Sequence, residues 1–81
     1  MESDKSLVSL SDLPVGKLAK VQCIVSNGNQ RRRFLDLGLI PGSIIKSERK
    51  SPSGNPTAYN IRGSIIALRN EEAQNIVVSI V

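Results

Sequence analysis

Residues 30–50 read QRRRFLDLGLIPGSIIKSERK, and this stretch contains the signals that decide the fold. Phe34 and Leu37 lie three residues apart, a spacing that places them on one face of a helix and predicts a short helix over Gln30–Leu37. Gly38 follows at the position where helices commonly end in a left-handed residue. The helix is therefore expected to stop abruptly, after about two turns.

The rest of this stretch predicts a turn and a strand. Pro41-Gly42 is typical of a type II turn, with proline at its second position and glycine at its third. Further short apolar segments alternate with turn residues before and after it, as in a small antiparallel barrel. The five expected strands are Lys17–Val25, Ser43–Lys50, Thr57–Arg62, Ser64–Arg69 and Ile76–Val81.

The first of these strands shows the period-2 pattern of a half-buried strand. Ala19, Val21 and Cys23 share one phase, so Cys23 is expected to be a small buried hydrophobic residue. Leu18 and Ile24 fall on the polar phase, which indicates a bulge or a two-sided end.

Short helices are expected near both ends of the domain. Ser9–Asp12 is typical of a capping box that opens one helical turn. Asn29 and Asn70 are expected to cap the main helix and a second one-turn helix. Residues 1–8 carry no pattern and are expected to be a loose terminus, followed by one domain over residues 9–81. The predicted class is mainly β, with one short helix inserted after the first strand.

Composition excludes several classes of function. The chain has 81 residues, no histidine and one cysteine, so an internal disulfide, a Cys/His zinc site and histidine-based catalysis are impossible. The N-terminus lacks the apolar region of a signal peptide, and a lone thiol suits a reducing compartment, so a cytoplasmic protein is expected. No catalytic residue, cofactor site, metal ligand set or small-molecule substrate is predicted, and the protein is not expected to be an enzyme.

Arg31-Arg32-Arg33 is the sharpest local feature of the sequence. These cations lie in the first helical turn, where they oppose the helix dipole, and Asp36 could pair with one of them across a turn. The run is either a solvated helix face or a docking surface for an acidic partner. Gly54 and Asn55 lie in a polar loop that is either a plain hairpin connection or a second contact.

The order of several motifs resembles the FeoA family, the ferrous iron transport protein A domain. Segments LSDLPVGKLAKV, RRRFLDLGLIPG, SPSGNP and IRGSIIALRNEEA carry the resemblance over nearly the whole chain. Asn55 stands where the family usually has an aspartate, and Ser47 where a more apolar residue is common. The residues that match the family's helix, turns, loop and C-terminal hairpin are Leu35, Leu37, Gly38, Pro41, Gly42, Pro52, Gly54, Pro56, Arg62, Gly63, Ala67, Leu68, Arg69, Glu72 and Ala73.

This resemblance implies an SH3-like barrel with helical insertions. It also implies a small cytoplasmic accessory protein of bacterial ferrous iron uptake, whose partner is FeoB, a membrane permease with a GTP-binding domain. Docking would then involve Arg31–Arg33 and the loop at Gly54 and Asn55. Any effect on GTP hydrolysis, and the oligomeric state, stay open at this stage.

Two alternatives compete with that function. The net charge of +4 and the arginines allow a nucleic-acid-binding barrel, although only Phe34 and Tyr59 are available to stack on bases. An iron-sensing module, related to the C-terminal domain of iron-dependent repressors, is the other. It would need an oxygen-only site, and the spacing of the candidate carboxylates suggests none; these are Asp36, Glu48, Glu71 and Glu72.

Overall fold

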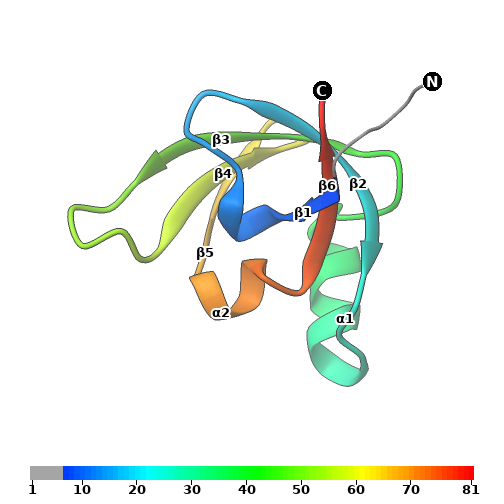
Figure 1. The fold of residues 1–81 in the computed structure, drawn as a ribbon. Coiled ribbons are helices and arrows are strands. Elements are labelled where there is room, and N and C mark those ends of the chain that lie inside the picture. The colour runs from blue at the N-terminus through cyan, green and yellow to red at the C-terminus, as the bar shows by residue number, and fades with distance from the viewer. Residues whose placement is uncertain (1–6) are drawn as a thin grey trace.

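Six strands form one antiparallel sheet that curls around the core in the order β1-β6-β2-β3-β4-β5 (Figure 1). The computed structural model describes residues 7–81. The strands are β1 (Leu7–Ser9), β2 (Leu18–Ile24), β3 (Ile44–Lys50), β4 (Thr57–Ile61), β5 (Ser64–Leu68) and β6 (Ile76–Ile80). The helices are the 3-10 turn η1 (Leu10–Asp12), α1 (Gly28–Asp36) and α2 (Asn70–Ala73). The predicted mainly-β class is confirmed.

The predicted count of five strands is wrong, because β1 pairs with β6 along Leu7↔Ser79, Val8↔Val78 and Ser9↔Val77. Val8 also packs against the core from this strand. The expected loose terminus over residues 1–8 is therefore wrong for Leu7 and Val8, and its residues 1–6 lie outside the described chain. Three residues are too few to show an alternating pattern, which is why the sequence did not reveal this strand.

The predicted bulge in β2 is present, and it reverses the expected roles of two residues. Val21 pairs with Val78, the register then shifts, and Cys23 pairs with Val77. The inserted residue turns Cys23 outward, where it is exposed, and turns Ile24 into the core. The prediction of a buried Cys23 is wrong for this reason.

The core contains both aromatic residues of the chain, Phe34 and Tyr59. The Tyr59 hydroxyl donates to the carbonyl oxygen of Leu10 at 3.3 Å, which ties β4 to η1. Burial raises the pKa of Tyr59, because the charged phenolate would lose its hydration. The other large side chains that are fully buried are Leu10, Leu13, Leu39, Ile45, Ile61, Leu68, Ile76, Val21, Val78 and Thr57.

The helix starts differ from their predicted positions. α1 begins at Gly28 with Asn27 at its N-cap, two residues before the predicted Asn29. The N-cap of η1 is Ser9, but its side chain makes no capping bond; its hydroxyl donates to the carbonyl oxygen of Gln74 at 3.3 Å. The predicted capping box at Ser9 is therefore wrong, since the hydroxyl bonds to a distant turn instead.

Candidate docking surface

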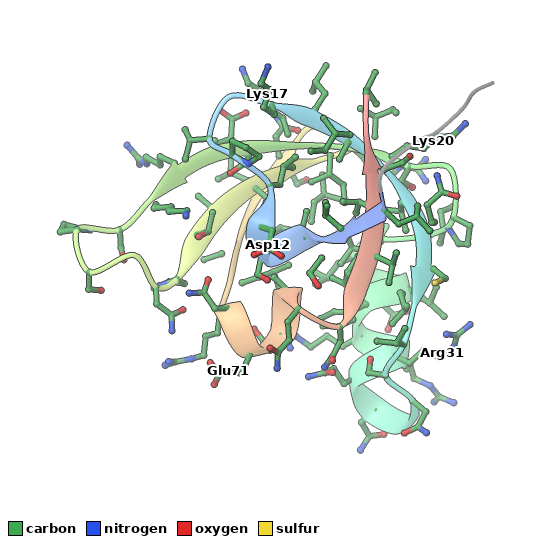
Figure 2. The ribbon with its side chains drawn as sticks, viewed as in Figure 1. Asp12, Lys17, Lys20, Arg31 and Glu71 are labelled. Atoms are coloured by element: carbon green, nitrogen blue, oxygen red, sulfur yellow. The ribbon has the colours of Figure 1, made fainter. Side chains whose placement is uncertain are left out.

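α1 lies outside the sheet at the base of the molecule and carries the arginine run (Figure 1). Phe34 is the one buried residue of this helix. Arg31, Arg32 and Arg33 are all exposed, and Figure 2 shows Arg31 on the outer side of the molecule beside α1. The predicted placement of the arginine run on the helix surface is therefore confirmed.

The three arginines differ in how they are held. Nη1 of Arg31 donates to the carbonyl oxygen of Ile24 at 3.2 Å. Arg33 forms an ion pair with Glu72 of α2, and its guanidinium carbon lies 5.8 Å from the centre of the Phe34 ring. Arg32 has no hydrogen bond or ion pair to any residue between 7 and 81. Arg32 is thus the cation of the run that is most available to a partner.

Asp36 was expected to pair with Arg32 or Arg33, and this prediction is wrong. Across residues 7–81, the ion pair of this helix joins Arg33 to Glu72, 39 residues away. Asp36, Arg31 and Arg32 instead border a shallow hollow of about 500 Å³ on the α1 surface. The side chain of Arg33 points toward α2, where Glu72 partly neutralises its charge.

The Glu72 carboxylate joins α1 to the start of α2. One carboxylate oxygen accepts from the backbone N–H of Arg69 at 3.1 Å, at the start of α2. The other pairs with Arg33, and this charged hydrogen bond lowers the pKa of Glu72 below its ordinary value. The predicted role of Glu72 at this helix start is confirmed, while the N-cap is Arg69 and not the expected Asn70. Glu71 is exposed and points away from the sheet (Figure 2).

The loop between β3 and β4 is tied to α2. Oδ1 of Asn55 accepts from the backbone N–H of Asn70 at 3.1 Å, and the carbonyl oxygen of Gly54 accepts from Nδ2 of Asn70 at 3.4 Å. α2 therefore contacts this loop on one side and Arg33 of α1 on the other. We call α1, α2 and loop residues 51–56 together the basal surface.

The glycines of the family motif build the turn after α1. Gly38 has a φ of +98° and its N–H bonds to the carbonyl oxygen of Leu35 at 3.0 Å, which confirms the predicted left-handed helix end. The N–H of Ser43 bonds to the carbonyl oxygen of Ile40 at 3.0 Å and Gly42 has a φ of +95°, as in the predicted type II turn at Pro41.

The hairpin between β4 and β5 turns through two left-handed residues, Arg62 at a φ of +55° and Gly63 at +92°. Arg62 is the only non-glycine residue in that conformation within the described chain. Its side chain passes so close to Gly38 that a Cβ added there would lie 2.9 Å from Cδ of Arg62. The motif residues Gly38 and Arg62 thus touch, although 24 positions separate them in the sequence.

The links that assemble the basal surface were missed by sequence reasoning. The bonds of Arg33 to Glu72, of Arg31 to Ile24 and of Asn70 to Asn55 join separate elements. Polar residues at helix ends and in loops have many possible partners, so no local signal marks these pairs. Leu68 and Ala73, two of the residues that match the family, lie in the core.

Residues 7–81 contain no group of three or more histidine, cysteine, aspartate or glutamate side chains placed to hold a metal ion. Over the same residues, none of the helices is both long and apolar enough to span a bilayer.

Comparison with known proteins gives consistent matches along the chain. The FeoA domain profile matches residues 8–80. A curated relative from Porphyromonas gingivalis (strain ATCC BAA-308 / W83), an Fe(2+) transport protein A/Fe(2+) transporter FeoB fusion protein, is 31% identical over 72 residues. The match covers 89% of this chain but 8% of the relative, so this chain spans a small part of that protein's length.

Two solved structures resemble this one closely. The FeoA protein from Chlorobium tepidum is 36% identical, with a TM-score of 0.86 over 91% of this chain and 70% of that chain. The FeoA of Stenotrophomonas maltophilia, described as a procaryotic SH3 domain protein complexed with zinc, is 31% identical, with a TM-score of 0.80 over 88% of each chain. By sequence profile and by its SH3-like fold, the chain belongs to the FeoA domain family.

Proposed function

We propose that this protein is an accessory protein of bacterial ferrous iron uptake that docks on a FeoB-type transporter in the cytoplasm. The observation that carries the proposal is the fused relative, in which a domain 31% identical to this chain is covalently joined to FeoB. Fusion holds two domains at a high effective concentration, so a weak contact suffices there. Without that covalent link, the contact must come from a binding surface on the domain itself.

The basal surface is the part of the molecule that best fits this role. It places Arg32 without a partner among residues 7–81, beside Arg31, on a helix that lies outside the sheet. Exposed cations steer an acidic partner into place and set the register of the contact. Gly54 and Asn55 form the other end of the same surface, because α2 joins their loop to α1.

The alternative of a nucleic-acid-binding barrel is weakened, because neither aromatic side chain of the chain is exposed for stacking on bases. Both aromatic residues of the chain, Phe34 and Tyr59, are buried with no more than 1% of their surface exposed. Single-strand binding by small barrels relies on exposed aromatic side chains on which bases stack. A protein partner is therefore the better-supported ligand of this surface.

The test is a binding measurement against the purified GTP-binding domain of the transporter and against the full-length transporter in detergent. Replacing Arg32 by glutamate should weaken binding about tenfold, since one attraction becomes a repulsion. Arg32 is chosen because its replacement breaks no hydrogen bond or ion pair with another residue of the described chain.

Lys17→Glu is the matched control, because Lys17 lies at the end of the molecule opposite α1 and the charge change is identical (Figure 2). It should leave binding to the transporter unchanged. Absence of wild-type binding to either form of the transporter would overturn the proposed function. Binding that both variants retain equally would overturn the basal surface as its site and leave the function standing.

A further inference from the structure

β5 is an edge of the sheet, and its outer side has no strand beside it in the described chain. β5 ends the strand order and pairs only with β4. A two-residue turn joins these strands, so Ile61 and Ser64 form the hydrogen-bonded pair that closes the hairpin. Bonded and non-bonded pairs alternate along an antiparallel ladder, which leaves the N–H and C=O groups of Ile65 and Ala67 pointing away from β4.

Nothing in residues 7–81 satisfies these outward groups. No turn, loop or cap hydrogen bond involves the backbone of Ile65 or Ala67. Ile65 is 60% exposed, and Ala67 is exposed beside it on the same face. Edge strands that avoid pairing usually carry a lysine, a proline or a bulge. β5 has the sequence SIIAL with an unbroken register, so it has none of these protections.

The side chains beside this edge determine which residues of an added strand would be complementary to it. Ala67 lies across from Ala58, which lies across from Arg49 on β3. The small alanines leave a shallow hollow of about 360 Å³, which Arg49 and Lys50 border from the far side. An acidic side chain on an added strand could reach over Ala67 toward these cations. Beside it, the exposed Ile65 offers an apolar contact to an aliphatic side chain.

The charges around the edge are mainly positive. Lys46, Arg49 and Lys50 lie on β3, and Arg62 and Arg69 flank the two ends of β5. The nearby acidic residues are Glu48, Glu71 and Glu72, and Glu72 pairs with Arg33 of α1. The five cations form no ion pair with another residue of the described chain.

A second copy of the chain fits this edge poorly. Antiparallel pairing of two β5 strands about Ile66 would bring Arg62 of each copy beside Arg69 of the other, because both ends of the strand carry a cation. Like charges brought together in this way oppose association, whereas a segment with carboxylates gains from the same arginines.

We propose that the β5 edge is a second docking site, which takes an extended acidic–aliphatic segment of a partner protein as an additional strand. The backbone groups of Ile65 and Ala67 would supply main-chain hydrogen bonds, as in other cases of strand addition. An aliphatic side chain would lie beside Ile65 and a carboxylate would face the hollow beside Ala67. The site is separate from the arginine run of α1 and does not depend on which partner binds there.

Nuclear magnetic resonance of the full ¹⁵N-labelled chain tests this site with short synthetic peptides. The probes are threonine-rich peptides in which valine and glutamate are separated by one threonine, in both orders. The amides of Ile65 and Ala67 should exchange more slowly with solvent when the peptide is bound. Those of Ile66 and Leu68 should change little, because β4 already protects them. Replacing the glutamate of the peptide by lysine should weaken binding about fivefold or more.

Two variants separate the backbone contact from side-chain effects. Ala67→Pro removes the outward N–H without touching the bonds to β4 and should weaken peptide binding about tenfold. Ala67→Ser keeps that N–H and should bind as wild type. If Ala67→Pro does not fold, the alternating protection of the wild-type amides decides the question on its own.

Three results would overturn the proposal. The first is equal binding of the glutamate and lysine peptides. The second is peptide-induced protection or shifts confined to α1. The third is protection of Ile65 and Ala67 that rises with protein concentration in the absence of peptide, which would make a second copy the occupant of the edge.

Discussion

The interior of the sheet and the base formed by α1 and α2 are held together by different contacts. Inside the sheet, aliphatic side chains from β2, β3, β4 and β6 pack around Tyr59, with almost no surface exposed. At the base, the joining contacts are polar: Arg33 to Glu72, Arg31 to Ile24, and Nδ2 of Asn75 to Oε1 of Gln30 at 2.9 Å. Phe34 is the one residue of α1 whose side chain is buried in the apolar core.

This difference indicates that the sheet interior provides stability, while the base is the region better suited to binding a partner. Burial of apolar surface is strong and tolerates few changes, because interiors are close-packed. Polar links between exposed side chains contribute little each, and they can be rearranged at small cost when a partner arrives. A basal surface with one buried apolar side chain in each helix, Phe34 and Ala73, and several polar links is therefore suited to binding, while the sheet interior maintains the fold.

The largest expected effect comes from removing the larger of the two buried side chains that anchor the base to the core, Phe34 of α1 and Ala73 of α2. Phe34→Ala should lower the free energy of unfolding by about 3–5 kcal/mol, through lost burial and the cavity left behind. A domain of this size has a total stability of roughly 4–12 kcal/mol, so the variant should be largely or partly unfolded. Urea denaturation followed by circular dichroism measures the change.

Leu35→Ala is the control for this substitution, because Leu35 is the neighbouring residue of α1 and is 36% exposed. It should lower the free energy of unfolding by about 1 kcal/mol or less. If Phe34→Ala lost no more stability than Leu35→Ala, the polar links would be what holds α1 to the sheet, and the contrast between the regions would fail.

A substitution of intermediate expected effect tests whether a buried polar group without a hydrogen bond lowers the free energy of unfolding. Ser47 of β3 is fully buried, and its hydroxyl has no hydrogen-bond partner among residues 7–81. Removing a buried, unsatisfied hydroxyl removes its desolvation penalty. Ser47→Ala should therefore raise the free energy of unfolding by about 1 kcal/mol, measured by urea denaturation.

Ser79→Ala is the matched substitution with the opposite expected sign. Ser79 is 4% exposed, and its hydroxyl accepts from Nε2 of Gln22 at 2.8 Å. Its loss should lower the free energy of unfolding by about 1 kcal/mol. Equal changes of the same sign in the two variants would show that hydrogen-bond satisfaction does not distinguish these positions.

The same contrast explains which features could be predicted from sequence. The end of α1 at Gly38 and the turn at Pro41-Gly42 depend on the conformation of the residues themselves, so local sequence indicates them. The polar phase of Ile24 indicated a bulge or a two-sided end, but the position of the inserted residue, which exchanges Cys23 and Ile24, becomes visible only when β2 is paired with β6. β1 is too short to produce a pattern.

The site was predictable only in part, for a related reason. A run of three arginines is visible in any sequence, and its placement on the surface of α1 was correct. Arg32 has no partner among residues 7–81, while its neighbours are bound to Ile24 and Glu72, which lie 7 and 39 positions from their arginines. The β5 edge requires the strand order of the whole sheet. Such features come from tertiary arrangement, and they make up most of the two docking sites that we propose.

The smallest expected effect concerns the ion pair that joins α1 to α2. A double-mutant cycle of Arg33→Ala and Glu72→Ala should give a coupling energy of about 0.5–1 kcal/mol at neutral pH, since Arg33 is half exposed. Its pH dependence has a defined sign. The pKa of Glu72 is lowered from 4.5 in the folded chain, so its stabilisation is present above that pH and is lost as the pH falls through the folded value.

The coupling should therefore weaken progressively as the pH falls below 4.5 and return on neutralisation, whereas the losses from Phe34→Ala and Ser79→Ala should be nearly independent of pH over that range. Glu72→Gln separates the charge from the cap, because its amide oxygen can still accept from the N–H of Arg69. This variant should lose the acid-dependent part alone. A coupling that persisted unchanged in acid would mean that packing, and not charge, joins the two helices, and the base would then resemble the sheet interior.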